Sequence, residues 1–189
     1  MKRHQKKLLL TVAMIAVGIA SRLFFHDHPI APNVEIVTVL SLLAGYYLGG
    51  WFALVVPFGV MAGSDFFIGN TGIFLFTWSA YLIGGLAGYL LRSARQRRWL
   101  TAKGVGLGLL FTLFFYLYTN FGVWLITPWY ERGLNGLLYC YYMGLPFLKY
   151  QLVGNLIFVT AGFTIAETIR RRVASKEKLI QAGTVNSKQ

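Results

Sequence analysis

The chain has 189 residues, of which 56% are hydrophobic and only 13% are charged, yet its formal net charge is +12. Soluble domains carry about 25% charged residues, so this composition excludes an ordinary soluble enzyme or a disordered tail. Cys140 is the single cysteine and cannot close a disulfide within the chain, which excludes a disulfide scaffold. The composition therefore predicts a small membrane protein with one integral domain, residues 1–189.

Six apolar runs follow one another along the chain, and we expect each to form a transmembrane helix. They cover residues 8–25, 34–48, 51–63, 73–91, 104–126 and 152–169, and a basic tail follows at 170–189. A spanning helix needs about 20 residues, so a chain of this length holds six of them and little else. The second and third runs are short, which predicts thin or tilted helices. The predicted fold is an all-α membrane bundle.

Two segments leave alternatives open. Residues 137–148 are aromatic, short and interrupted by Pro146, which favours an interfacial or re-entrant segment over a spanning one. The first run follows a basic stretch and contains Gly18-Ile19-Ala20, a pattern also typical of a signal peptide and its cleavage site. That run stays apolar as far as Phe25, however, and this favours a helix that is retained in the mature protein.

The basic residues mark one side of the predicted bundle. Most of the 18 lysines and arginines lie in the N-terminal tail, in the connection at 92–103 and in the C-terminal tail. Six spans place all three clusters on the same side, as the positive-inside rule requires of the cytoplasmic side. We therefore expect both termini to be cytoplasmic. The charge then reports orientation, and we expect no nucleic acid as a partner.

Small residues recur at a spacing of four along several runs. Such pairs let helices approach closely in lipid, where association depends on backbone contact. We expect the glycine pairs to pack inside the bundle; they are Gly45 and Gly49, Gly84 and Gly88, and Gly104 and Gly108. Ala16 and Ala20 form an AxxxA in the first run, and this pair could instead face a partner protein.

Polar residues gather at the helix ends opposite to the basic clusters. Tyr116, Asn120 and Trp124 recur at i, i+4 and i+8 and share one helix face, and Gln151 and Asn155 repeat this spacing on the last run. Polar groups within spans are costly and indicate function, so we expect a pocket that binds a small solute from outside. Its candidate residues are Arg22, Asn33, Glu35, Asp65, Asn70, Tyr116, Asn120, Trp124, Gln151 and Asn155.

In such a pocket the charged side chains would orient the solute, the amides would hydrogen-bond it and the aromatic rings would stack on it. The alternative is that the same groups only hold the fold together. Arg22 would then pair with Glu35 or Asp65, the amides would join neighbouring helices, and Trp124 would belong to an interfacial aromatic belt.

Motifs of catalysis are missing from the sequence. HExxH, GxSxG and GxxxxGK[ST] do not occur, and the three histidines lie outside the predicted spans. His26 and His28 could present two imidazoles to a metal ion, but no further cluster supplies the remaining ligands. We therefore expect no enzyme, no bound metal and no cofactor.

Several strings resemble an uncharacterised family of small bacterial membrane proteins related to the substrate-binding (S) components of energy-coupling-factor (ECF) transporters. They are Arg22-Leu23-Phe24, Pro32-Asn33-Val34, Ser64-Asp65 with Gly69, Thr119-Asn120-Phe121-Gly122-Val123-Trp124, and Leu145-Pro146-Phe147 with Gly154-Asn155. The resemblance implies a six-helix S-component-like bundle in the bacterial cytoplasmic (inner) membrane. It also implies uptake of a vitamin or similar micronutrient bound near the outer face.

The same resemblance implies partners. S components work with a transmembrane coupling protein and two ATPases, and the AxxxA that contacts the coupling protein matches Ala16 and Ala20. A loop signature for a particular vitamin is not recognisable, so the substrate stays open. Two other functions remain: a membrane scaffold of similar fold that transports nothing, and a solitary carrier that couples to protons through Asp65 or Glu35.

Overall fold

The structure, a computed structural model, describes residues 3–28, 33–70, 72–92 and 99–186. Of the features predicted above, Pro32, residues 93–98 and the end of the basic tail, residues 187–189, lie outside these ranges. Within the described ranges the chain is helical and contains no β-strand, which confirms the all-α class. The helices are α1 (Arg3–Asp27), α2 (Val37–Leu43) with a π-helical turn η1 (Ala44–Leu48), α3 (Phe52–Ile68), α4 (Phe74–Arg92), α5 (Leu100–Ile126) and α6 (Leu134–Asn186).

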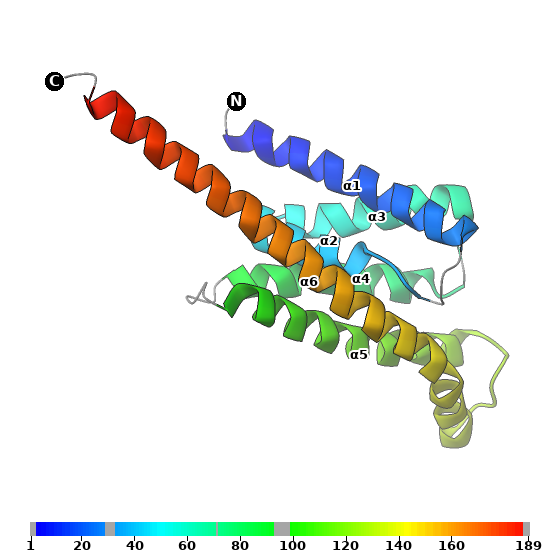
Figure 1. Ribbon diagram of the computed structural model, residues 1–189. Coiled ribbons are helices and arrows are strands. Elements are labelled where there is room, and N and C mark those ends of the chain that lie inside the picture. The colour runs from blue at the N-terminus through cyan, green and yellow to red at the C-terminus, as the bar shows by residue number, and fades with distance from the viewer. Residues whose placement is uncertain (1–2, 29–32, 71, 93–98, 187–189) are drawn as a thin grey trace.

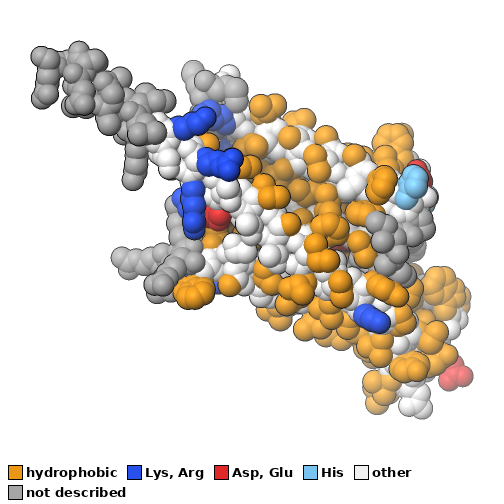
Figure 2. Space-filling model, viewed as in Figure 1, with side chains coloured by type: hydrophobic (Ala, Val, Ile, Leu, Met, Phe, Trp, Pro, Cys, Tyr) orange, Lys and Arg blue, Asp and Glu red, His pale blue; other side chains and the backbone are white. Residues whose placement is uncertain are grey.

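Four of these helices, α1, α4, α5 and α6, are long and apolar enough to cross a membrane. The other two apolar helices are shorter, as the short second and third runs predict. On the face seen in Figure 2, hydrophobic side chains are spread over the body of the bundle, whereas most of the lysine and arginine side chains gather at the end that carries both termini. The molecule therefore has an apolar body and one basic end.

The short helix α2 occupies the centre of the bundle (Figure 1). It contacts α3, α4, α5 and α6, and α1 packs mainly against α3 on the outside. Apolar side chains of α2 and its neighbours build two adjoining cores, one around Val37, Met61 and Phe115 and the other around Leu42 and Phe163. A central helix with almost no exposed residue needs apolar or hydrogen-bonded side chains on every face, and α2 has them.

Glycines set the closest approach between the central segment and α4. A Cβ atom added at Gly45 would collide with the backbone carbonyl of Gly85, and one added at Gly88 would collide with the backbone of Leu42. On the other side of the bundle, Gly108 packs under Val159 of α6. These contacts confirm the packing role for Gly45, Gly88 and Gly108, whereas Gly49 lies in the turn after η1 with a positive φ.

Gly45→Ala should lower the free energy of unfolding by about 1–3 kcal/mol, because the added methyl group meets backbone that cannot move aside. The matched control is Gly106→Ala in α5, where an added Cβ meets nothing within 4 Å. That change should be neutral or stabilising, since alanine is the better helix former. Thermal unfolding of the two variants in detergent measures the difference, and equal stability would contradict the close crossing.

The last helix differs from the sequence prediction. Residues 137–148 and 152–169 do not form separate segments, because α6 runs without interruption for 53 residues and includes Pro146. Proline lacks an N–H and clashes with the preceding turn, so it bends a helix that its neighbours hold in place. The first turns of α6 lie at an angle to the rest (Figure 1). The proline therefore bends this helix instead of ending it.

Candidate functional site

A cavity of about 480 Å³ lies at the end of the bundle opposite to the basic end. Volumes of this size are typical of small-molecule sites. Every α-helix except α2 contributes to its wall, as does the connection between α1 and α2. The polar residues that line the cavity are Arg22, His26, Asn33, Glu35, Asp65, Thr77 and Gln151, and the others are mainly apolar or aromatic.

An ion pair joins α1 to α3 in the wall of this cavity. The Nη2 of Arg22 lies 2.6 Å from Oδ1 of Asp65, and the two side chains are 19% and 7% exposed. Trp78 of α4 donates from Nε1 to the other carboxylate oxygen of Asp65 at 2.7 Å. Sequence analysis left open whether Arg22 pairs with Asp65 or Glu35, and the structure selects Asp65. Both oxygens of this carboxylate are therefore occupied.

Glu35 lies just before α2, and its carboxylate binds the first turn of this helix. Its two carboxylate oxygens accept from the backbone N–H of Thr38 at 2.9 Å and from the Thr38 hydroxyl at 2.5 Å. An anionic side chain at this position caps the free N–H groups of the first turn and is favoured by the helix dipole. Glu35 therefore lines the cavity while both of its oxygens are used to hold the end of α2.

A line of polar side chains continues from Glu35 into the core. Asn155 of α6 donates from Nδ2 to the hydroxyl of Thr112 at 2.8 Å and to that of Thr38 at 3.4 Å. The three side chains are buried and come from three different helices. In a low-dielectric core such bonds fix the position of helices relative to one another. Asn155 thus joins three helices behind the cavity wall and does not line the cavity itself.

Two buried donors at the cavity have no hydrogen-bond partner among the described residues. They are Nε of Arg22 and Nε2 of Gln151, whose side chain is only 2% exposed. Buried polar groups without partners are rare in folded proteins, and each costs about 1–3 kcal/mol. Since both residues line the cavity, a bound solute could supply the missing acceptors.

The structure brings together five of the ten predicted site residues: Arg22, Asn33, Glu35, Asp65 and Gln151. Asn155 lies behind the cavity, as described above. Asn70 is exposed beyond the end of α3 and does not line the cavity. The five residues at the cavity come from distant parts of the sequence and are brought together by the fold. The predicted pocket is therefore formed in part.

The predicted aromatic face of α5 does not reach the cavity. Tyr116 donates to the carbonyl of Tyr141 at 2.6 Å, and Trp124 donates to the carbonyl of Glu131 at 3.0 Å. Asn120 donates to the carbonyl of Tyr116 on its own helix. Tyr116 and Asn120 face the N-terminal part of α6, Trp124 faces the loop before it, and none of the three is among the residues that line the cavity. Successive helical residues point about 100° apart, and it is Phe115, one position earlier, that faces the cavity.

Sequence reasoning missed several residues of the site. Trp78 had no distinguishing signal, because an aromatic residue within an apolar run is common in membrane helices. Thr38 had a weak one: an acid just before a helix can accept hydrogen bonds from the free N–H groups of the first turn. Tyr81 and Phe115 supply aromatic walls, but periodicity alone does not tell a cavity wall from a core.

Ala16 and Ala20 are both exposed on α1, whereas Gly18 on the other face lies against Val60 of α3. Among the described residues no group of three His, Cys, Asp or Glu side chains is placed to hold a metal ion. His26 lies instead at the cavity with its Nδ1 3.0 Å from Oδ1 of Asp27.

Comparison with known proteins gives one family. DUF6580, a family of unknown function, matches residues 2–179, a range that reaches from α1 into the last part of α6. No curated protein and no solved structure matches the chain.

Proposed function

The chain belongs to the DUF6580 family of unknown function, and we propose that it is a membrane-embedded substrate-binding component for the uptake of a small solute, in the manner of ECF S components. It crosses the bacterial inner membrane six times, with its basic end in the cytoplasm and its cavity facing outward. The observation that carries this proposal is the cavity itself, where the buried Gln151 amide nitrogen lacks a partner.

The free hydrogen-bonding groups of the cavity indicate the kind of solute. Asp65 and Glu35 already accept hydrogen bonds at both oxygens, whereas Arg22 and Gln151 each keep a donor without a partner. A solute that fits must therefore bring acceptors, such as carbonyl or carboxylate oxygens. Asp65 already balances the Arg22 charge, so the cavity favours a neutral acceptor such as a carbonyl oxygen.

The remaining wall is apolar and aromatic. Met61, Tyr81 and Phe115 are buried side chains that line the cavity from three different helices. Such walls bind a ring or another flat apolar body, while a few polar groups fix its orientation. The solute class is therefore a small molecule with one apolar, partly aromatic portion and one oxygen-rich portion, as in many vitamins and related micronutrients.

Small molecules that copurify with the protein test this proposal. Mass spectrometry of an extract from purified protein should find one solute at near-stoichiometric amount, and Gln151→Leu should reduce its occupancy at least about tenfold, because one hydrogen bond is lost and a donor site becomes apolar. Asn120→Leu is the matched control, since it also removes an amide but lies outside the cavity. The control should retain the solute.

A membrane scaffold that binds no solute is the second candidate, and one observation favours it. Tyr116, Trp124 and Asn155 are all engaged in bonds between segments of the bundle. If no solute copurifies, and if Gln151→Leu changes only the thermal stability, then the cavity is a structural void. A scaffold function would then replace the proposed transport function.

A further inference from the structure

Among the described residues that line the cavity opposite to the basic end, Glu35 is the acid without an ion pair. Arg22 is the one lysine or arginine of that lining, and it is bound by Asp65 at 2.6 Å. His26 is paired with Asp27, which does not line the cavity. The ion pairs between described residues do not include Glu35. The negative charge of Glu35 therefore lies at the cavity without a cationic partner.

The residues outside the described ranges that join α1 to α2 and α3 to α4 add no charge, because residues 29–32 and residue 71 are uncharged in the sequence. The first turn of α2, where Thr38 donates to both Glu35 oxygens, offsets about half of one charge. A carboxylate has about four acceptor positions, so about two of those on Glu35 are left for a ligand. The cavity therefore lacks positive charge and can accept a donor that carries it.

Aromatic rings share this cavity with Glu35. Tyr81 of α4 and Phe115 of α5 are buried and line it, and their ring centroids lie 5.1 Å apart with the planes tilted by 45°. Phe25 of α1 lines the cavity as well. The faces of aromatic rings carry negative partial charge and attract cations. A carboxylate together with such rings is a combination that binds ammonium groups and positively charged heterocycles.

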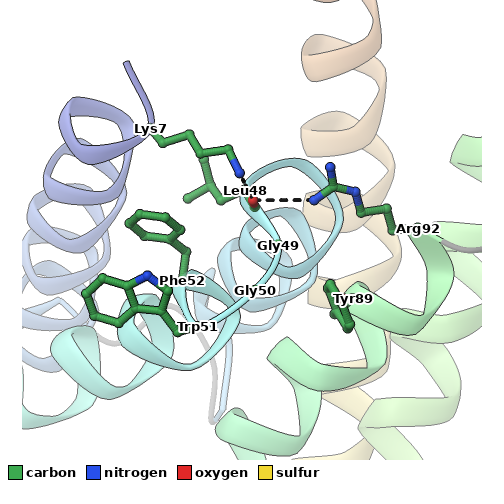
Figure 3. Close-up of a pocket in the computed structure, with 8 residues that line it drawn as sticks. All are labelled: Lys7, Leu48, Gly49, Gly50, Trp51, Phe52, Tyr89 and Arg92. Carbon is green, nitrogen blue, oxygen red and sulfur yellow. Dashed lines mark hydrogen bonds between the residues drawn. The ribbon is translucent and has the colours of Figure 1, made fainter. Parts of the chain in front are cut away.

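A second cavity, of about 590 Å³ at the basic end, has the opposite character. Lys7 of α1 and Arg92 of α4 line it, and both donate to the carbonyl of Leu48 (Figure 3). The described residues that line this second cavity include no acid. They therefore offer a cation no counter-charge, and a cationic probe reports on the cavity that Glu35 lines.

We propose that the solute carries a cationic group, such as a protonated amine or a positively charged ring nitrogen, which lies against Glu35 and the rings of Tyr81 and Phe115. This inference rests on the proposed function and narrows the class of solute. The free amide nitrogen of the buried Gln151 binds a neutral acceptor, such as a carbonyl oxygen, elsewhere on the same molecule. A neutral analogue would leave the Glu35 charge unpaired in a site of low dielectric, and this gives the cavity its selectivity.

Isothermal titration of the purified full chain in detergent, with two probes of equal size, tests the inference. The probe 1-methylnicotinamide carries a fixed positive charge on its ring, whereas 6-methylnicotinamide is neutral, and both present the same amide carbonyl. We expect the wild type to bind the cationic probe at least about tenfold more tightly, and Glu35→Gln to remove this preference. Glu35→Asp keeps the charge and should keep the preference. Glu131→Gln is the matched control, because this acid is exposed between α5 and α6 and does not line the cavity.

Three results would overturn the cationic group and leave the proposed uptake function standing. The wild type could bind both probes equally, or Glu35→Gln could keep the preference. Loss of the preference in Glu131→Gln as well would mean general attraction of cations to the acids of this end. A copurified solute without a cationic group at neutral pH is the third result, and it decides the question even where Glu35→Gln does not fold. The absence of any copurified solute, together with no binding of either probe, would instead overturn the proposed function and this inference with it.

Discussion

Asp65→Asn should lower the free energy of unfolding by about 3 kcal/mol or more, because it leaves the Arg22 guanidinium mostly buried without a counter-charge. Asparagine has the shape of aspartate and still offers an oxygen to the indole N–H of Trp78, which donates to Asp65 in the wild type. The change therefore isolates the ionic part of the interaction. Thermal or denaturant-induced unfolding in detergent measures it.

A double-mutant cycle makes this prediction sharper. Arg22→Met alone should also destabilise, since it leaves the Asp65 carboxylate buried and unpaired, whereas Arg22→Met combined with Asp65→Asn should recover most of the loss. Asp27→Ala is the control, because its contact with His26 is largely exposed and should contribute little. If Asp65→Asn unfolds together with the wild type, the pair does not hold α1 on α3.

Most of the helical fold could be predicted from the sequence, and the reasons are visible in particular segments. Uniformly apolar runs that end at glycine or charged residues predicted the bounds of α1, α4 and α5 to within a few residues. The length of an apolar run is a strong signal of a membrane-spanning helix. The course of α6 was harder. Pro146 predicts a break on local grounds, but packing of α6 along α5 keeps the helix continuous.

The candidate site was predicted less completely, because residues at one depth of a bundle need not face one cavity. Arg22, Glu35 and Asp65 stood out as charges in an apolar chain, and the fold brings all three to one place. Tyr116 and Phe115 are neighbours in sequence and point in different directions, and only tertiary structure decides which of them faces the cavity. Rotation of α5 about its axis is set by its contacts with α6, which the periodicity of α5 alone does not contain.

The two ends of the bundle also differ in what the sequence says about them. At the end opposite to the basic clusters, charged side chains within apolar runs are a clear signal of a candidate site. At the basic end, Lys7 and Arg92 belong to clusters that orientation already explains, so nothing in the sequence singles them out. Their convergence on the Leu48 carbonyl depends on how α1 and α4 pack around η1.

Replacing Ala16 and Ala20 together by leucine should lower the rate of uptake at least about tenfold. The amount of bound solute and the stability of the protein should not change. Both alanines are exposed on α1 and lie away from its contact with α3. Under the proposed function this small-residue face packs closely against a coupling protein, and two isobutyl groups would prevent the approach. Uptake in cells that express a coupling protein and two ATPases, and solute bound to the purified variant, are the two measurements.

The pair of measurements separates three mechanisms. Ala161→Leu is the control, since it places the same bulk on an exposed position of α6 and should leave uptake intact. Loss of bound solute in the Ala16→Leu, Ala20→Leu variant would mean that this face supports the fold and not a partner. Uptake that continues in cells without the ATPases, and that follows a proton gradient, would instead indicate a solitary carrier. Because the alanines lie outside the cavity, only a coupled transporter predicts full occupancy together with lost uptake.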